Sequence, residues 1–364
     1  MKPLLKEIRH NKLLWLLVFV PVVFGAQQFW HDAHTPLFVL SVLAIVPLAA
    51  LLSHATESVA ARTGDAVGGL LNATLGNLTE LVIALTALRA GQYVLVKASL
   101  AGAIVTNTLF MLGASLLLGG LKYHVQEYNR SSARMQASML FLATVALLIP
   151  SAVSQADSVT GATFTQQLSV GLSLLLIVTY GLGMLYSLKT HRELFASAAS
   201  GETDHAPWPM GLALGTLAGV TVLVAMVSEI FVESVQQAAS TFGMTPAFVG
   251  FIIVALVGGA AEMVAAFSGA RKNRLDLSVG IALGSASQIA LFVAPVLVLV
   301  SYLIGPTPMD LQFWPGAVVM MLVAVLTASM VTNSGRSAWF VGVLLLMAYA
   351  IFAMTLYLLP PRVA

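Results

Sequence analysis

The amino-acid sequence predicts an all-α membrane protein of about eleven transmembrane helices, arranged as an inverted repeat of five plus five helices with an extra N-terminal helix. Composition is the first of three observations behind this fold class. Of the 364 residues, 59% are hydrophobic and 9% are charged, and the mean hydropathy is +0.92, whereas a soluble domain has roughly 25% charged residues. The second observation is the length of the apolar runs, and the third is a polar motif that occurs twice at one fixed spacing.

The apolar runs are long enough to cross a bilayer as helices, each of which needs about 20 residues. They lack the alternation of apolar and polar residues that a membrane β-barrel requires. The first run follows a basic segment, as in a signal peptide, but no clean small-residue cleavage site follows it, so we expect a retained helix. The expected spans are 13–30, 36–60, 66–89, 93–119, 135–152, 163–188, 209–235, 246–270, 276–304, 312–332 and 337–359.

The basic residues are distributed unevenly between the two sides of these spans. If the N-terminus is cytoplasmic, only Arg89, Lys97 and Arg362 of the 17 Lys and Arg residues fall on the outer side, which leaves 17 − 3 = 14 on the cytoplasmic side. An excess of basic residues in cytoplasmic loops sets the orientation of membrane proteins. We therefore expect a multi-pass protein of the cell (plasma or inner) membrane, with a cytoplasmic N-terminus and a C-terminus on the outer side.

The polar motif ends in a glutamate and occurs once in each half of the chain. Glu80 and Glu262 are the two glutamates, and 262 − 80 gives an offset of 182 residues. The same offset pairs residues well beyond the motif, for example Phe110 with Phe292. Repetition at one offset indicates a duplicated transporter that builds a single central site from both copies.

This duplication predicts the domain organisation. The segment 189–208 is the only connection with a soluble composition, and we interpret it as a linker between the halves. With the first helix set aside, five spans lie on each side of the linker. Because five is odd, the second copy must cross the bilayer in the opposite direction. The expected units are the N-terminal segment and first helix 1–35, a first five-helix repeat 36–188, a cytoplasmic linker 189–208 and a second five-helix repeat 209–364.

Glu80 and Glu262 are the main candidates for binding a cation or protons, and for holding a metal ion. A charged residue at the centre of a membrane helix costs about 2.5 kcal/mol or more, so it is interpreted as functional unless a structural role is found. Glycines beside each glutamate lower helix propensity by about 1 kcal/mol each relative to alanine, and local unwinding would free backbone carbonyls there. Such oxygens suit a hard cation such as Ca²⁺. The expected binding set is Glu80, Glu262, Asn77, Gly76, Gly258 and Gly259.

Other polar residues within the spans are expected to support this site. Serines in membrane helices often bond to their own helix, which we expect of Ser99 and Ser287, whereas an amide in lipid needs partners. His54, one turn before Glu57, is either a proton relay or a solvated residue near a helix end. Glu57 and Glu233 lie near span ends, where water can solvate them. The expected supporting residues are Thr79, Asn107, Thr106, Ser285, Gln288, Glu57, Glu229, Glu233 and His54.

Several kinds of protein are excluded by residues that the chain lacks. It has no cysteine, which rules out disulfides, thiolate metal sites and cysteine nucleophiles, and it has no H-E-x-x-H zinc motif. We expect a protein that is not an enzyme, needs no cofactor and binds no nucleic acid. Its expected partners are a small inorganic cation, the proton and the lipid bilayer. A cation channel stays open as an alternative, because paired glutamates on glycine-broken helices can line a selectivity filter.

Six segments resemble the cation/proton exchangers of the Ca²⁺/cation antiporter superfamily. They are Gly68–Leu81, Ser99–Gly102, Lys189–His191, Phe248–Phe251, Val257–Glu262 and Gly284–Phe292. Together they extend over the chain from the second span onward. The resemblance implies an eleven-helix Ca²⁺/H⁺ antiporter with inverted five-helix repeats, in which Glu80 and Glu262 bind cation and proton competitively.

Two positions depart from the pattern of that family. Asn77 keeps the asparagine that precedes the first glutamate, but Gly259 stands where the second asparagine is expected, and Met263 replaces a common histidine. One side-chain oxygen fewer leaves the cation open: Ca²⁺ with a water filling the gap, or Na⁺, K⁺ or Mn²⁺. In each case the two carboxylates repel each other, so a cation or protons must neutralise them before the site can change access, and proton influx would drive cation efflux.

Overall fold

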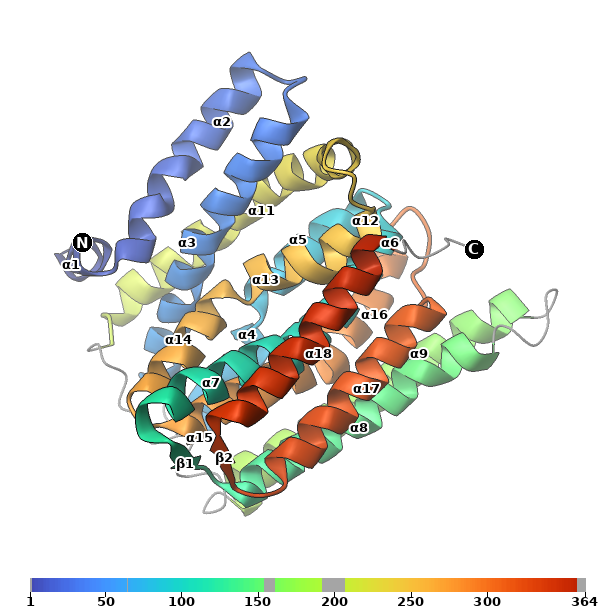
Figure 1. Ribbon diagram of the computed structural model, residues 1–364. Coiled ribbons are helices and arrows are strands. Elements are labelled where there is room, and N and C mark those ends of the chain that lie inside the picture. The colour runs from blue at the N-terminus through green and yellow to red at the C-terminus, as the bar shows by residue number, and fades with distance from the viewer. Residues whose placement is uncertain (1, 64, 154–160, 192–206, 359–364) are drawn as a thin grey trace.

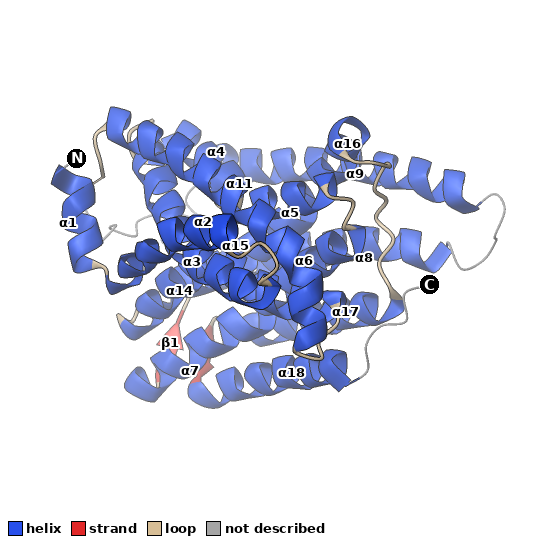
Figure 2. Ribbon diagram, turned by 90° about the horizontal axis from the view of Figure 1, so that it is seen from above, coloured by secondary structure: helices blue, strands red, loops and turns tan. Residues whose placement is uncertain are grey.

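The computed structural model describes residues 2–63, 65–153, 161–191 and 207–358. This part of the chain is almost entirely helical (Figures 1 and 2), which confirms the predicted all-α class. Its only strands are β1 (Val125–Glu127) and β2 (Arg336–Ala338), which pair antiparallel with Val125 opposite Ala338. Most of the predicted linker, residues 192–206, and Arg362 near the C-terminus lie outside the described segments.

The helices follow the predicted spans closely. In the first half they are α1 (Lys2–His10), η1 (Lys12–Val18), α2 (Phe19–Phe29), α3 (His34–Ala60), α4 (Asp65–Leu75), α5 (Leu78–Arg89), α6 (Tyr93–Val105), η2 (Thr106–Met111), α7 (Leu112–Tyr123), α8 (Arg130–Val153), α9 (Gly161–Leu185) and η3 (Tyr186–Thr190). In the second half they are α11 (Met210–Thr241), α12 (Pro246–Phe248), η5 (Val249–Val254), α13 (Ala255–Gly258), α14 (Ala260–Arg271), α15 (Leu275–Gln288), η6 (Ile289–Val293), α16 (Ala294–Ile304), α17 (Pro315–Thr332) and α18 (Trp339–Leu358).

Within the described residues, nine continuous helices are long and apolar enough to cross a membrane, and a tenth span, Pro246–Arg271, is bent by 58°. The one remaining predicted span, 66–89, is present as the two shorter helices α4 and α5, so the count of eleven stays a prediction. Gly76 and Asn77 separate α4 from α5, and Gly259 separates α13 from α14. The expected interruption of the helix therefore occurs just before each glutamate.

The offset of 182 residues also relates the helix bounds. Adding 182 to the bounds of α5 gives 260–271, which are the bounds of α14, and α6 and α15 begin at residues 93 and 275. The π-helices η2 and η6, in which each backbone hydrogen bond closes a wider turn than in an α-helix, follow α6 and α15 and end at residues 111 and 293, which are again 182 apart. Such π turns often mark functional sites. Local structure is thus repeated together with the sequence motif.

The bundle contains three groups of helices, of which one lies between the other two. Helices α2, α3 and α11 lie on one side and α8, α9 and α17 on another, with α5, α13 and α14 between them (Figure 1). The rings of Phe38 and Phe231, whose centroids are 5.4 Å apart, join α3 to α11. Close packing in the centre depends on small residues: a side chain on Gly102 of α6 would overlap the backbone of Phe251 in η5. Without a hydrophobic force between helices in lipid, such close approach supplies the packing energy.

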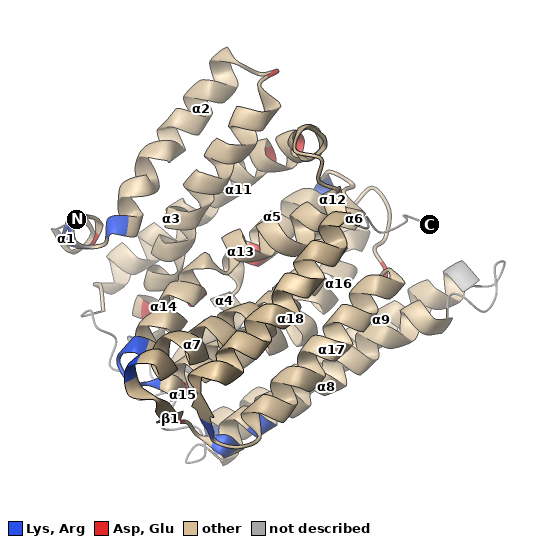
Figure 3. Cartoon of the chain, viewed as in Figure 1, with Lys and Arg blue, Asp and Glu red and all other residues tan. Residues whose placement is uncertain are grey.

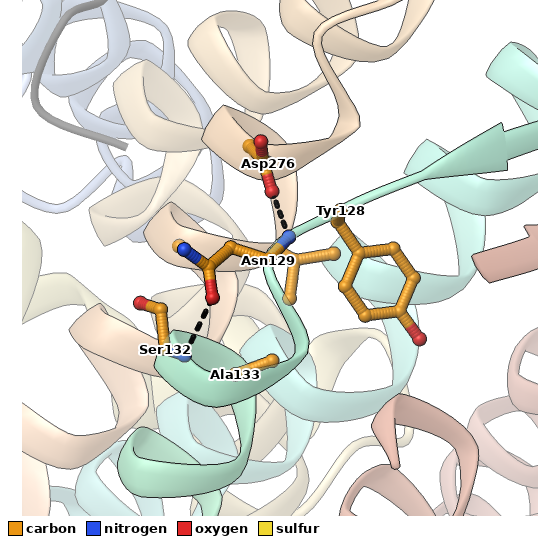
Figure 4. Close-up of a pocket in the computed structure, with 7 residues that line it drawn as sticks. Tyr128, Asn129, Ser132, Ala133 and Asp276 are labelled. Atoms are coloured by element: carbon orange, nitrogen blue, oxygen red, sulfur yellow. Dashed lines mark hydrogen bonds between the residues drawn. The ribbon is translucent and has the colours of Figure 1, made fainter. Parts of the chain in front are cut away.

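A hydrogen-bonded clasp joins the two halves at the end of the bundle that carries β1. The amide nitrogen of Gln126 donates to the carbonyl of Ala270 and to Oδ1 of Asn273, both at 2.9 Å. Beside it, the backbone N–H of Asn129 donates to the carboxylate of Asp276, next to a small cavity of about 10 Å³ (Figure 4). The clasp fixes the turn between α14 and α15 against the connection between α7 and α8.

A second clasp holds the opposite end of the bundle. Lys97 of α6 forms an ion pair with Asp310 at 2.5 Å, and both side chains are largely buried. The hydroxyl of Tyr93 donates to the carbonyl of Thr307 at 2.6 Å and accepts from its N–H at 2.9 Å. The turn between α5 and α6 is therefore fixed by the loop between α16 and α17. Each hairpin that carries one of the two glutamates is held by the other half of the chain.

Charged residues gather at the two ends of the bundle. Most of the described Lys and Arg residues lie toward the end with β1 and the α14–α15 turn, which holds Arg271, Lys272 and Arg274 (Figure 3). Arg89 and Lys97 lie at the other end, beside the second clasp. The structure thus separates the basic residues into a crowded and a sparse side, as expected for a protein with a defined orientation in the membrane.

The contact at Gly102 gives a test of this packing. We expect Gly102→Ala to lower the stability by about 1–3 kcal/mol, because the added methyl group forces α6 away from η5. Gly171→Ala in α9 is the matched control, since nothing lies within 4 Å of its added carbon. Thermal unfolding in detergent measures both variants. Equal unfolding temperatures for the two would contradict the close approach of α6 and η5.

Candidate functional site

The two glutamates occupy equivalent places at the beginnings of α5 and α14. Each lies three residues after the break in its span, in the first turn of the helix that follows. The positive end of a helix dipole stabilises a carboxylate there by about 0.3–1 kcal/mol in exposed helices and more when it is partly buried. At both breaks the N-terminus of the following helix thus places a partial positive charge beside the negative charge of the glutamate.

Glu80 and Glu262 lie close together in the bundle, because the side chain of Glu80 reaches the break that precedes Glu262. Glu80 lies against Gly258, where an added Cβ would be 2.9 Å from its Cγ. Glycine at 258 is therefore what lets the carboxyl group from α5 approach the break between α13 and α14. Oε2 of Glu262 is buried and accepts no hydrogen bond from the described residues. A buried oxygen without a partner indicates a place for a proton, a water or a cation.

A chain of amides and hydroxyls lies beside the two carboxyl groups. Asn77 donates from Nδ2 to Oε1 of Gln288 at 2.6 Å. Its Oδ1 accepts from the hydroxyl of Ser285 at 2.8 Å, and that hydroxyl in turn accepts from Nδ2 of Asn107 at 2.8 Å. Ser285 also contacts the carboxyl group of Glu262. The chain crosses between the halves three times, and both amides that the sequence singled out, Asn107 and Gln288, have partners in it.

The predicted glycines adjoin this chain in different ways. A Cβ on Gly76 would lie 3.3 Å from Oε1 of Gln288, so Gly76 leaves room for the amide that Asn77 holds. A Cβ on Gly259 would lie 3.6 Å from Oδ1 of Asn107. The structure therefore brings together nine of the predicted residues, which are Glu80, Glu262, Asn77, Gly76, Gly258, Gly259, Ser285, Gln288 and Asn107.

Two predicted threonines lie near the site without joining the chain of amides. Thr79 is buried in the first turn of α5, next to Glu80. Thr106 pairs with the hydroxyl of Tyr349 in α18 at 3.2 Å. Under the offset Thr106 corresponds to Gln288, but the two side chains have different partners. Tyr349 is a buried polar partner that the sequence analysis missed, since it sits in an apolar run with no motif around it.

The structure does not bring the other predicted acidic residues to this site. Glu229 is exposed and forms an ion pair with Arg89 at 3.5 Å. Glu233 is exposed as well, and with Gln27, His31, His34 and Ser234 it lines a cavity of about 60 Å³ between α11 and the α2–α3 turn. Glu57 is half-buried and accepts from Ser53 of its own helix at 3.2 Å.

His54 and the two serines give a mixed result. The ring of His54 packs on Trp208, with centroids 4.3 Å apart, so it is neither fully solvated nor part of the polar chain. Ser99 bonds to Val96 of its own helix at 2.8 Å, as expected. The expectation for Ser287 was wrong, because its hydroxyl donates to the carbonyl of Gln136 in α8 at 3.2 Å. Helix α15 packs against α8, and no pattern in the sequence predicts that contact.

The donor set suits weak and reversible binding. Within the described segments, no group of three or more His, Cys, Asp or Glu side chains is placed to hold a metal ion. What lies together is two carboxyl groups with neutral amide and hydroxyl oxygens. Hard cations such as Ca²⁺ accept oxygen ligands in variable number, and few charged ligands allow release. The same carboxyl groups can take up protons instead.

Comparison with known proteins agrees with this architecture. The family model described as sodium/calcium exchanger protein matches residues 33–189 and, a second time, residues 212–358. The Ca²⁺/H⁺ antiporter of Aphanothece halophytica is 40% identical over 360 residues, which cover 95% of this chain and 96% of that protein. The Ca²⁺/H⁺ antiporter ChaA of Bacillus subtilis is 40% identical over 356 residues, covering 96% and 100%.

A solved structure has the same fold. Native YfkE superposes with a TM-score of 0.83 at 37% identity, covering 96% of this chain and 100% of that one. The crystal structure of its selenium-substituted form is described as that of a Ca²⁺/H⁺ antiporter protein. The repeated motif, the paired glutamates and these similarities lead to one conclusion. The chain belongs to the sodium/calcium exchanger protein family, whose members are transporters rather than enzymes.

Proposed function

We propose that this protein is a secondary active antiporter that exchanges a cation, in the first place Ca²⁺, for protons by alternating access. The observation that carries the proposal is the approach of Glu80, which follows the break in one span, to the break before Glu262 in another span. One carboxyl group comes from each half of the chain. Relatives that match nearly the whole chain are named Ca²⁺/H⁺ antiporters, which supports both the cation and the proton as substrates.

The mechanism follows from the charge of the two carboxyl groups. When both are ionised they repel each other and are poorly hydrated, so the empty, doubly charged site is unfavourable inside the bilayer. One divalent cation neutralises both charges, and so do two protons. The site can therefore change access in either of the neutral forms but not when it is empty and charged. This condition couples cation movement to proton movement, and no residue outside the pair of carboxyl groups is needed for the coupling.

The amide chain favours Ca²⁺ over smaller or softer cations. Asn77, Asn107 and Ser285 place neutral oxygens beside the carboxyl groups, and Ca²⁺ takes 6–8 oxygen ligands at roughly 2.3–2.6 Å. No thiolate or imidazole of the described residues joins them, which disfavours cations that prefer sulfur or nitrogen. Na⁺, K⁺ and Mn²⁺ remain the alternatives within the same mechanism. They differ from Ca²⁺ in charge or in preferred ligand number.

The proposal includes an inverted repeat in the cell membrane. The repetition of helix bounds at the offset of 182 residues and the double match of the family model support two equivalent units, residues 36–188 and 209–364. The crowding of basic residues at the end with β1 supports a cytoplasmic position for that end, and hence a cytoplasmic N-terminus. The relation of the halves through an axis in the membrane plane would let both glutamates reach the same depth.

Removal of either central charge tests the assignment of the site. We expect Glu80→Gln and Glu262→Gln each to reduce exchange at least a hundredfold, because a single carboxyl group cannot balance a divalent cation against two protons. Exchange is measured in proteoliposomes with an imposed pH gradient and a pH-sensitive dye. Glu127→Gln, which removes an exposed carboxyl group in β1, is the control and should exchange at the normal rate. A Glu80→Gln variant with normal exchange would remove the site from the mechanism.

Addition of cations in turn identifies the substrate and separates an antiporter from a channel. Everted vesicles receive Ca²⁺, Mn²⁺, Na⁺ and K⁺ one at a time while the pH gradient is followed. We expect Ca²⁺ to dissipate the gradient at the lowest concentration, since one divalent cation replaces two protons. Cation flux that proceeds at the same rate with no proton movement would instead indicate a channel, and the antiport proposal would then fail.

A further inference from the structure

The two halves of the site differ at one position. Asn77 lies three residues before Glu80, and its equivalent before Glu262 is Gly259, because 77 + 182 = 259. The second half therefore lacks the amide that the first half supplies. The backbone at Gly259 has φ −78° and ψ 7°, a conformation that residues with a side chain also adopt. The absence of a side chain is therefore not a requirement of the backbone.

The space beside Gly259 is occupied by atoms of other residues. An added Cβ would lie 3.3 Å from the carbonyl oxygen of Ala255, 3.4 Å from Cε of Met263 and 3.6 Å from Oδ1 of Asn107. A Cβ alone fits there with small shifts, but any longer side chain would have to displace the methyl group of Met263 or the amide of Asn107. The amide oxygen of Asn107 thus borders the space that an asparagine side chain at 259 would enter.

The orientation of Asn107 is set by its hydrogen bonds. Nδ2 donates to the hydroxyl of Ser285 at 2.8 Å, and this hydroxyl donates its own hydrogen to Oδ1 of Asn77 at 2.8 Å. Because Ser285 has a single hydrogen to donate, its oxygen can only accept from Asn107. The amide of Asn107 therefore directs Oδ1 to the side of Gly259. Ser285, which holds Asn107, also contacts the carboxyl group of Glu262, whose Oε2 is buried and accepts no hydrogen bond from the described residues.

We propose that Asn107, from the first half, supplies the amide oxygen that position 259 lacks, and that glycine at 259 leaves the space this oxygen needs. Asn107 is then a specificity-determining residue that adds a neutral oxygen on the Glu262 side of the cation. The inference rests on the proposed function, since it assigns a ligand to the same site. It replaces the expectation that a water molecule fills the gap.

The test exchanges the source of the oxygen and measures the Ca²⁺ concentration that gives half-maximal proton movement in proteoliposomes. We expect Asn107→Ala to raise this concentration about tenfold, the size of effect typical of losing one supporting group at a metal site. Thr108→Ala is the matched control: Thr108 is buried in the same π-helix but bonds only to its own helix, at 2.7 Å to Ile104. It should leave the concentration unchanged.

The decisive variants combine Asn107→Ala with a substitution at 259. Gly259→Asn should restore the half-maximal Ca²⁺ concentration to within about twofold of the original, because its amide enters the vacated space. Gly259→Ala fills part of that space without an oxygen and should not restore it. Such coupling between two neighbouring positions is what a double-mutant cycle measures. Restoration by alanine, or none by asparagine, would overturn the proposal, and so would an unchanged Ca²⁺ dependence in Asn107→Ala alone.

Two further measurements keep the outcome clear. If Asn107→Ala does not reach the membrane, Asn107→Leu replaces it. That variant has about the same size but no amide oxygen, so the half-maximal Ca²⁺ concentration should rise about tenfold, and an unchanged value would contradict the proposal. Glu80→Gln is measured beside these variants. Normal exchange in Glu80→Gln would refute the proposed function itself, whereas its loss together with an unaltered Asn107→Ala would refute only the role of Asn107.

Discussion

Two carboxyl groups that face each other inside the bilayer are the constraint on which the rest of the structure depends. Each needs a place in the fold where its charge is tolerable in one state and removable in another. The broken spans provide such places, because each break puts a helix N-terminus directly before a glutamate. Glycine at 258 then allows the carboxyl group of Glu80 to reach the opposing break. The amide chain surrounds the pair with neutral groups that hold their positions through one another.

The clasps at the two ends explain how the site keeps its geometry although both of its helices are interrupted. A broken helix lacks the stiffness of a continuous one, so the separation of Glu80 and Glu262 must be fixed from outside. Gln126 does this at one end by bonding to the turn after α14, and the ion pair of Lys97 with Asp310 does it at the other. In both cases the loop that holds one hairpin belongs to the other half. The halves are therefore interlocked rather than merely adjacent.

The sequence alone predicted the features that depend on local composition and repetition. Apolar runs predicted the positions of the spans to within a few residues, and the offset of 182 residues predicted which glutamates belong together. Features that depend on which helices touch could not be predicted. Ser287 bonds to α8, Thr106 bonds to Tyr349, and Glu229 pairs with Arg89. Each of these contacts joins residues more than a hundred positions apart, and no spacing rule connects them.

The π-helices η2 and η6 set the direction in which the following helices present their side chains. η2 ends at Met111 and η6 at Val293, so each is followed by a further helix, α7 or α16, at the offset of 182 residues. A π turn holds one residue more than the α turn it replaces, and one residue rotates an α-helix by about 100° around its axis. Deletion of one residue from either π-helix would therefore turn the outward-facing side of α7 or α16 toward the interior of the bundle, while the glutamates stayed in place.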